Sequence, residues 1–204
     1  MSADILRRLR EVDWSAKSEA TISSQLIMPM LVALGYGEHT LHRVAEQRTY
    51  KLKDPTVSKG SRRVRLDYEP KVYEEGLWVM EAKGSDAPVD AATLGQVRDY
   101  AIHPEVRAPL MVTVDAAGVR VFDPWAEHWD EPLVTVALNE VADRIHELRS
   151  VLGADRVADV VRRRHLDHLR HFGRSPEAVI ARWPRTGPRW AGLSSTLTHR
   201  SPDG

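Results

Sequence analysis

The segment that most constrains the fold is residues 77–83, Leu-Trp-Val-Met-Glu-Ala-Lys. Side chains alternate between the two faces of a β-strand, so Trp78 and Met80 share one face while Glu81 and Lys83 share the other. The apolar face has to be buried against other elements, whereas two charges on one face at a strand end are unusual for a purely structural strand. The segment therefore predicts a sheet in which one strand ends at a polar site.

The patterns on either side of this strand predict an α/β fold. Apolar residues recur every three or four positions in the segments predicted to be helical, and β-branched residues cluster in those predicted to be strands. Helices are predicted at 18–34, 89–103, 139–152 and 154–172, and strands at 64–73, 77–83, 110–114, 119–122 and 133–137. Residues 41–52 give at best a short strand, and 53–61 are predicted to be a loop. We expect a mixed, mainly antiparallel central sheet flanked by helices, with a C-terminal helical extension.

Composition limits the chemistry that this fold can perform. The chain has no cysteine, so thiolate metal sites and a cysteine nucleophile are excluded, and catalysis has to use oxygen, nitrogen and bound ions. Its 29 basic and 29 acidic residues balance, so any nucleic-acid surface must be local. Charged residues throughout positions 1–14 argue against a signal peptide, and we expect a cytoplasmic protein without a membrane span.

A second acid, Asp67, lies on the strand predicted before Glu81. If the two strands pair, the two carboxylates come within about 5 Å of each other. Such a pair repels unless a cation lies between, and Mg²⁺, with Mn²⁺ as an alternative, suits oxygen ligands. Lys83 would orient a water and offset charge on a phosphate. From these residues alone, a surface ion pair at a strand end remains an equal alternative.

A competing acid-x-lysine triplet occurs at Glu69-Pro70-Lys71, with Asp54 upstream of it. We reject this register because Pro70 would interrupt a ladder of hydrogen bonds and Asp54 falls in the predicted loop.

Several ordered features make residues 15–125 similar to a known family. They are Ser18-Glu19-Ala20-Thr21 with Pro29, Leu31, Leu34, Gly35 and Tyr36 downstream, Arg65-Leu66-Asp67-Tyr68, Val79-Met80-Glu81-Ala82-Lys83, Gln96 with Tyr100, and the hairpin through Thr113, Gly118 and Phe122. This region resembles the N-terminal nuclease domain of type I restriction enzyme R subunits, within the PD-(D/E)xK nuclease superfamily. The proline of the superfamily motif is Leu66 here.

The resemblance implies roles for individual residues. It makes Asp67 and Glu81 metal ligands, and Ala82 is included with them. It makes Lys83 catalytic and places Glu19 along the same site; taken alone, Glu19 is an ordinary first-turn acid. It also implies that Gln96 and Tyr100 support catalysis and DNA contact. The predicted organisation is a PD-(D/E)xK nuclease-like core at 1–125, a strand and helices at 126–182, and a disordered tail at 183–204.

A basic segment precedes Asp67. Residues 48–65 contain seven basic residues and the single acid Asp54. Such a segment can hold a phosphate backbone, although a solvated loop is an equal alternative. The predicted nucleic-acid-binding residues are Lys51, Lys53, Lys59, Arg62, Arg63 and Arg65.

These observations predict a Mg²⁺-dependent endonuclease that hydrolyses DNA, in restriction or a related defence process. The chain has no Gly-x-x-x-x-Gly-Lys-Ser/Thr phosphate loop, so it lacks an ATP motor of its own. The candidate partners are DNA, with RNA as the alternative substrate, a separate translocase or targeting subunit, and a second copy of the chain. The competing hypothesis is a catalytically idle DNA-binding or assembly module with the same fold.

Overall fold

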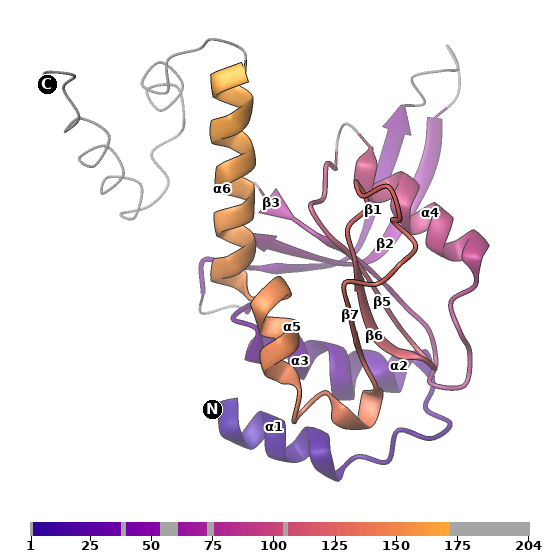
Figure 1. Ribbon diagram of the computed structural model, residues 1–204. Helices are drawn as coiled ribbons and strands as arrows, with labels where there is room; N and C mark the ends of the chain where they lie inside the picture. The colour runs from indigo at the N-terminus through magenta and orange to yellow at the C-terminus, as the bar shows by residue number, and fades with distance from the viewer. Residues whose placement is uncertain (1, 38–39, 54–60, 73–75, 104–105, 172–204) are drawn as a thin grey trace, which may run out of the picture. The chain divides into compact units, whose positions relative to one another are not determined.

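The computed structural model describes residues 2–37, 40–53, 61–72, 76–103 and 106–171. Over these ranges the chain forms a seven-stranded sheet in the order β1-β2-β4-β5-β6-β7, with β3 paired to β2 beside that path (Figure 1). The strands are β1 Val44–Lys53, β2 Ser61–Val72, β3 Gly76–Leu77, β4 Val79–Ala82, β5 Met111–Asp115, β6 Gly118–Phe122 and β7 Val134–Val136. Among the strands of the described residues, only β4 and β5 pair in parallel.

The helices fall before, within and after this sheet in sequence. They are α1 Ser2–Glu11, α2 Glu19–Ile22, the π-helical η1 Ser23–Ile27, α3 Met28–Ala33, α4 Ala91–Ile102, the 3₁₀ turn η2 Leu138–Glu140, α5 Ile145–Leu152 and α6 Ala154–His171. Ser18 caps the stretch from α2 to α3 by accepting from the Thr21 N–H, and Gly35, with φ of 99°, follows its end. The predicted helix at 18–34 is thus confirmed, with a π-helical segment in its middle.

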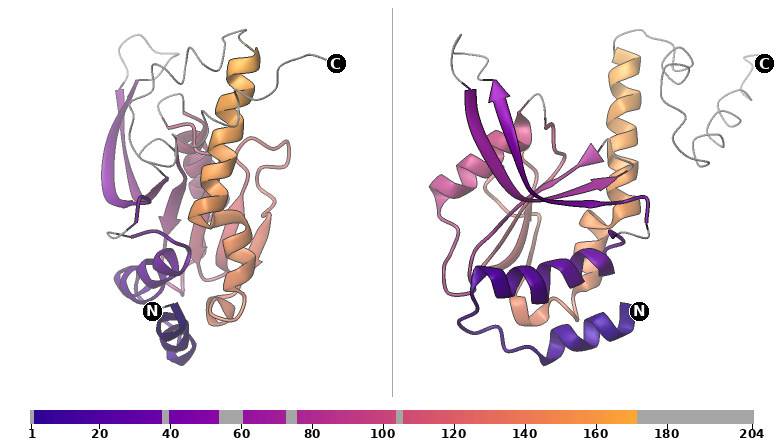
Figure 2. Two further views of the ribbon diagram at one scale, coloured as in Figure 1. Left: turned by 90° about the vertical axis from the view of Figure 1, so that its left-hand side faces the viewer. Right: turned by 180° about the vertical axis from the view of Figure 1, so that it is seen from behind.

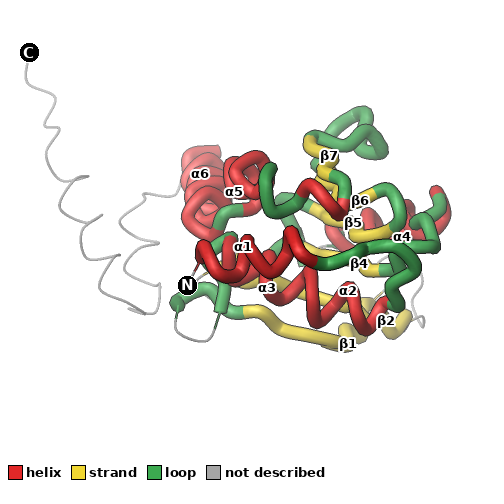
Figure 3. The backbone as a smooth tube through the Cα atoms, turned by 90° about the horizontal axis from the view of Figure 1, so that it is seen from below, coloured by secondary structure: helices red, strands yellow, loops and turns green. Residues whose placement is uncertain are grey.

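Two apolar clusters cover the two faces of the sheet. On one face, Met80 and Val112 pack in a cluster with Ile22 from α2 and Leu148 from α5. On the other face, the residues next to these in each strand, Val79 beside Met80 and Met111 beside Val112, pack against α4. Figures 2 and 3 show α1, α2 and α3 lying together, away from α4. Strand alternation therefore produces a core on both faces.

The apolar face of β4 is anchored by Trp78, which is fully buried. Its indole N–H donates to the Tyr36 hydroxyl at 2.9 Å, and that hydroxyl donates to the Leu152 carbonyl at 2.9 Å. The buried polar atoms are thereby satisfied, and the strand, the end of α3 and the end of α5 are tied together.

The predicted mixed, mainly antiparallel α/β sheet with flanking and C-terminal helices is confirmed. Several elements differ from the sequence-based expectations. The predicted helix at 139–152 is the turn η2 followed by α5, which begins at Ile145, and the predicted strand at 77–83 is divided between β3 and β4. The structure forms α1 near the N-terminus, where no helix was predicted, and buries Leu9 from it. β1 is also ten residues long rather than short, because nearly every residue pairs with β2. Pairing with a long partner strand overrides a weak local pattern.

The strand and helices expected after residue 125 are present. β7 pairs with β6, and Leu148 and Leu152 of α5 are fully buried in the main cluster. The first compact unit runs from Met1 to Val161, so the core includes these elements. The second unit starts at Arg162, and its described part is the last turns of α6 up to His171. The predicted tail, 183–204, lies outside the described residues. Within the described residues, no helix combines the length and apolar character that crossing a membrane requires.

Candidate active site

The register between β2 and β4 brings the two predicted acids together. Tyr68 and Met80 are Cα partners in an antiparallel pair, so Asp67 lies opposite Glu81 on the same face of the sheet. The Ala82 N–H donates to Asp67 Oδ2 at 3.0 Å. This hydrogen bond holds the Asp67 carboxylate beside the C-terminal end of β4, where Glu81 is also located.

Lys83 completes the cluster at this strand end. Its Nζ donates to Glu81 Oε1 at 2.9 Å. The side chain of Lys83 is 36% exposed and that of Glu81 is 19% exposed. The ammonium is therefore accessible to a ligand from solvent, whereas the Glu81 carboxylate is largely enclosed.

Glu19 is brought to the same place by the segment that precedes α2. The Ser85 N–H donates to the Lys17 carbonyl at 2.9 Å, and the Lys17 N–H donates to Ser85 Oγ at 2.6 Å. These two bonds fasten the start of α2 to the chain just beyond β4. Glu19, the first residue of α2, therefore lies close enough to Glu81 for its charge to act on that carboxylate, and its role in the site remains a prediction.

Gly84 permits this close approach. A Cβ at position 84 would lie 3.0 Å from the Lys17 carbonyl oxygen and 2.8 Å from Asp86 Oδ1. Any side chain here would push the α2 segment away from β4. Gly84, Lys17 and Ser85 were not among the residues predicted from sequence, because nothing local indicates that these two segments meet.

The electrostatics of the site centre on Glu81. Burial is the main reason why the pKa of Glu81 lies above its ordinary value of 4.5. The charges of Asp67 and Glu19 raise this pKa further, while the hydrogen bond from Lys83 opposes the rise. In return, that hydrogen bond raises the pKa of Lys83. The lysine is therefore fully protonated at neutral pH, and the carboxylate is held at an energetic cost.

This cost should be measurable as a stability change in metal-free protein. With a raised pKa the folded chain binds a proton at Glu81 more tightly than the unfolded chain, so stability falls as pH rises from 4.5 through the raised pKa. We expect Glu81→Gln to raise Tm by about 2–4 °C near neutral pH, with the gain vanishing below about pH 4. Thermal unfolding across this pH range tests the expectation.

Glu147 provides a control of opposite sign. Hydrogen bonds from Arg144 lower the pKa of Glu147, so its charge stabilises the fold above its unfolded pKa. Glu147→Gln should therefore lower Tm at neutral pH, and the loss should shrink in acid. If Glu81→Gln also lowered Tm at neutral pH, Glu81 would be a stabilising ion-pair partner rather than a costly charge.

The residues at the end of β4 fit a magnesium ion. Asp67 and Glu81 offer two carboxylates, and Ala82 can contribute only its backbone carbonyl. Magnesium in proteins commonly uses one or two carboxylates together with waters and substrate phosphates, so this donor set is sufficient. In the part of the chain that the structure describes, no three His, Asp or Glu side chains form a group that could hold a metal ion. Glu19 therefore does not complete a preformed three-residue ligand set.

Gln96 and Tyr100 both lie on α4, which packs on the face that carries Glu81. The N-terminus of α4 is the end near the site. Asp90 caps this end, and its pKa is lowered mainly by the hydrogen bonds from Thr93 and further by the nearby charge of Lys83. Gln96 is exposed and lies about 9 Å along the helix from Asp90, at 1.5 Å per residue. Tyr100 packs against the second apolar cluster. Within the described residues neither forms a hydrogen bond with Asp67, Glu81 or Lys83, and their predicted roles remain predictions.

The competing triplet has a different environment. Pro70 does not interrupt β2: it lies within the strand, paired with Val44, and its carbonyl accepts from the Trp78 N–H. The argument from Pro70 against this register is therefore wrong, whereas Asp54, the basis of the other argument, lies outside the described residues. Glu69 is completely buried, however, so it cannot reach a substrate from solvent.

Most of the predicted phosphate-binding residues fall on the β1–β2 hairpin. Arg65 and Arg63 lie two and four residues before Asp67 in β2, and Arg63 pairs with Lys51 of β1. Lys53 is two residues farther along β1. Alternation places these four basic residues on the same face of the ladder as Asp67. In the right-hand view of Figure 2 the outer part of this hairpin extends away from α1, α2 and α3.

The other predicted basic residues are placed differently. Arg62 pairs with Leu52 and lies on the opposite face of the ladder, as does Arg48, which pairs with Leu66. Lys59 lies outside the described residues. The register thus divides a segment that looks uniformly basic in sequence.

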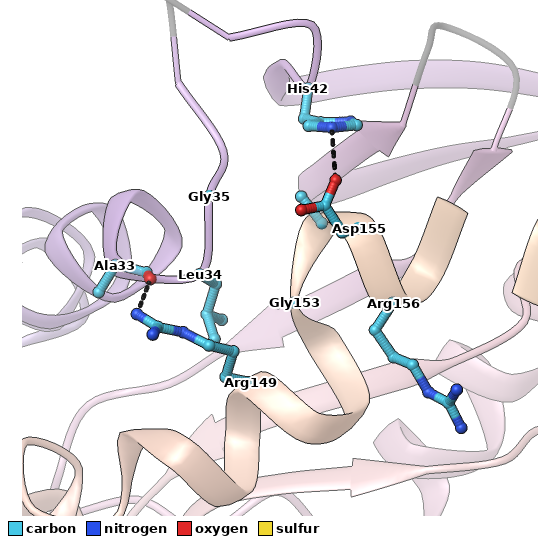
Figure 4. A pocket seen from close by; sticks show the side chains of 9 residues that line it. Ala33, Leu34, Gly35, His42, Arg149, Gly153, Asp155 and Arg156 are labelled. Carbon is cyan, nitrogen blue, oxygen red and sulfur yellow. Dashed lines mark hydrogen bonds and ion pairs between the residues drawn. The ribbon is translucent and has the colours of Figure 1, made fainter. Parts of the chain in front are cut away.

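A separate pocket of about 470 Å³ lies elsewhere in the first unit (Figure 4). Within it, His42 Nε2 lies 4.0 Å from Asp155 Oδ1, and Arg149 donates to the Ala33 carbonyl at 2.7 Å. Its lining comprises Ala33, Leu34, Gly35, His42, Arg149, Gly153, Ala154, Asp155 and Arg156. None of these is a predicted site residue; one contact joins α5 to α3, and the other joins the segment before β1 to α6.

The fold and the site define a mixed α/β protein in which two carboxylates and a lysine meet at the C-terminal end of a central strand. No family model, curated protein or solved structure compared with the chain matches it. The family resemblance therefore depends on the motifs themselves.

Proposed function

We propose that this protein is a Mg²⁺-dependent endonuclease that hydrolyses phosphodiester bonds in DNA. The observation that carries the proposal is the pairing of β2 with β4, which sets Asp67 opposite Glu81 and beside Lys83. Two acids and a lysine at one strand end suit metal-assisted hydrolysis, and the raised pKa of Glu81 marks a charge kept at a cost.

The residues of the chain would divide the work as follows. Asp67 and Glu81 would hold Mg²⁺ with one carboxylate each, which would relieve their repulsion. The ion would supply polarisation of a phosphoryl oxygen and a lower pKa for a water. Lys83 would turn from Glu81 toward the phosphate, where its ammonium would offset negative charge that accumulates in the transition state.

A nuclease assay tests the proposal directly. Purified protein is incubated with single- and double-stranded DNA and RNA, each with Mg²⁺, with Mn²⁺ and with a chelator. We expect cleavage of DNA that requires the metal. Metal-dependent cleavage of RNA alone would change the substrate class. Binding of DNA without cleavage under any of these conditions would instead support a catalytically idle DNA-binding or assembly module.

The basic hairpin provides the complementary support for a nucleic-acid substrate. Arg63 lies four residues from Asp67, or about 13 Å at 3.3 Å per residue. In the strand register the positions of Arg65, Arg63, Lys51 and Lys53 follow one another outward from Asp67, and we propose that their basic side chains form a track. Such a track can carry a phosphate backbone to the carboxylates.

The two faces of the hairpin allow a charge-matched test. The double variant Lys51→Gln/Arg63→Gln should weaken DNA binding for all sequences alike and lower the slope of log K against log salt by about 0.9 per lost phosphate contact. The control Arg48→Gln/Arg62→Gln removes two charges from the opposite face and should leave the slope nearly unchanged. Fluorescence anisotropy at several salt concentrations measures both. Equal slopes for the two doubles would exclude a track on the Asp67 face.

We further propose that the protein acts in the cytoplasm in restriction or a related defence process. With no phosphate loop of its own, it would receive DNA from a separate translocase or targeting subunit, or act as an assembly of identical copies.

A further inference from the structure

Glu81 has a neighbour in β5 that the catalytic assignment does not use. Glu81 and Thr113 are Cα partners in the parallel β4–β5 pair, so both lie on the same face of the sheet. Thr113 is completely buried. Its hydroxyl has no hydrogen-bond partner within the described residues.

A buried hydroxyl without a partner destabilises a fold, and valine has nearly the same shape without that cost. The position therefore calls for an explanation beyond packing. The neighbouring acid on the same strand does not provide one. Asp115 already accepts from Arg120 at 2.6 Å, from the Val89 N–H at 2.5 Å and from the Ala117 N–H at 3.0 Å.

Glu81, the Cα partner of Thr113, is the next carboxylate to consider. In this structure its hydrogen-bond donor is Lys83, at 2.9 Å. The proposed chemistry needs Lys83 at the phosphate, which would leave a largely enclosed carboxylate without its donor. A hydroxyl on the adjacent strand, buried on the same face, is suitably placed to replace it.

We propose that Thr113 is a positioning residue for Glu81, donating a hydrogen bond to its carboxylate when Lys83 moves to the substrate. This inference rests on the proposed function, because that function is the reason for Lys83 to leave. Arg120, the partner of Thr113 in β6, donates from Nη2 to Asp115, while its buried Nε has no hydrogen-bond partner within the described residues.

A thermal double-mutant cycle tests this without metal or substrate. In the wild-type background, Thr113→Val should raise Tm by about 2–4 °C because it removes an unpaired hydroxyl. In the Lys83→Ala background the hydroxyl should already hold Glu81, so Thr113→Val should lower Tm or leave it unchanged. Equal increases in both backgrounds would show that Thr113 does not respond to the loss of Lys83 and would overturn the proposal.

Activity and metal titration provide the second readout. Thr113→Val should reduce kcat about tenfold, raise the Mg²⁺ concentration at half-maximal rate, and leave KM for DNA unchanged. Thr113→Ser, which keeps the hydroxyl, should restore kcat. The control is Thr135→Val. Thr135 is an exposed threonine in β7 that pairs with Arg120, the β6 partner of Thr113. Wild-type kcat in Thr113→Val would contradict the proposal.

The two readouts distinguish failure of this inference from failure of the proposed function. If Thr113→Val changes Tm differently in the wild-type and Lys83→Ala backgrounds but the protein cleaves nothing, the Thr113–Glu81 interaction stands and the proposed nuclease function fails. If the protein is an active nuclease but Thr113→Val changes Tm equally in both backgrounds, the nuclease function stands and the role of Thr113 fails. A Thr113→Val protein with a lower Tm than wild type would show that the hydroxyl already has a partner, and the proposal would fail.

Discussion

Lys83→Ala should bind DNA and Mg²⁺ like the wild type but cleave about 10²–10³-fold more slowly. The substitution leaves Asp67 and Glu81 in place, and the lysine side chain is one-third exposed, so the fold should persist. What is lost is an ammonium whose strongest interaction forms in the transition state, and such a loss lowers kcat rather than binding. Single-turnover cleavage together with DNA and Mg²⁺ binding isotherms would separate the two effects.

Two further variants sharpen this result. Lys83→Arg should not restore cleavage, because guanidinium is planar and wider than the compact ammonium that contacts Glu81. Lys71→Ala is the matched control, since Lys71 belongs to the competing triplet beside the buried Glu69. If Lys71→Ala abolished cleavage while Lys83→Ala did not, the catalytic centre would be assigned to the wrong strand.

Asp67→Asn should abolish Mg²⁺ binding and cleavage while keeping the fold intact. Asparagine retains an oxygen that can accept from the Ala82 N–H, now 3.0 Å from Asp67 Oδ2, but it removes the negative charge. In the wild type, Mg²⁺ at 100 times its Kd should stabilise the fold by about 2.7 kcal/mol. In Asp67→Asn that rise in Tm should disappear, and calorimetric titration should show little heat of binding.

Asp67→Ala separates charge from structure at the same position. It loses the charge and also leaves the Ala82 N–H without its acceptor, which should cost about 1–3 kcal/mol of stability in addition. Its metal-free Tm should therefore lie below that of Asp67→Asn. Asp130→Asn, an exposed acid far along the chain, should match the wild type in every measurement. An undiminished Mg²⁺ response in Asp67→Asn would remove Asp67 from the ligand set.

The local pattern of the chain was sufficient to predict several elements. Alternation over 77–83 predicts that Trp78 and Met80 are buried and that Glu81 faces the other way, and the structure agrees. Alternation is a property of the extended backbone and needs no knowledge of distant residues. For the same reason, helix α4 and the β5–β6 hairpin appear where their spacing predicted them.

Other features were not predictable because they depend on distant pairings. Whether Asp67 meets Glu81 depends on the register of β2 against β4, which a shift of one residue would reverse. The length of β1 and the separation of Arg62 from Arg63 onto opposite faces depend on the same kind of register. The sequence alone shows that these residues form a basic segment, but not which of them share a face of the sheet.

The sequence by itself determined the α/β class, the buried strand and the set of acids and bases from which a site could be built. The tertiary structure alone decided that Glu19 reaches this strand through the Lys17–Ser85 bonds, and that Thr113 lies beside Glu81. Periodicity is encoded over a few neighbouring residues, whereas contacts between segments tens of residues apart follow from strand order and packing, which only the whole chain determines.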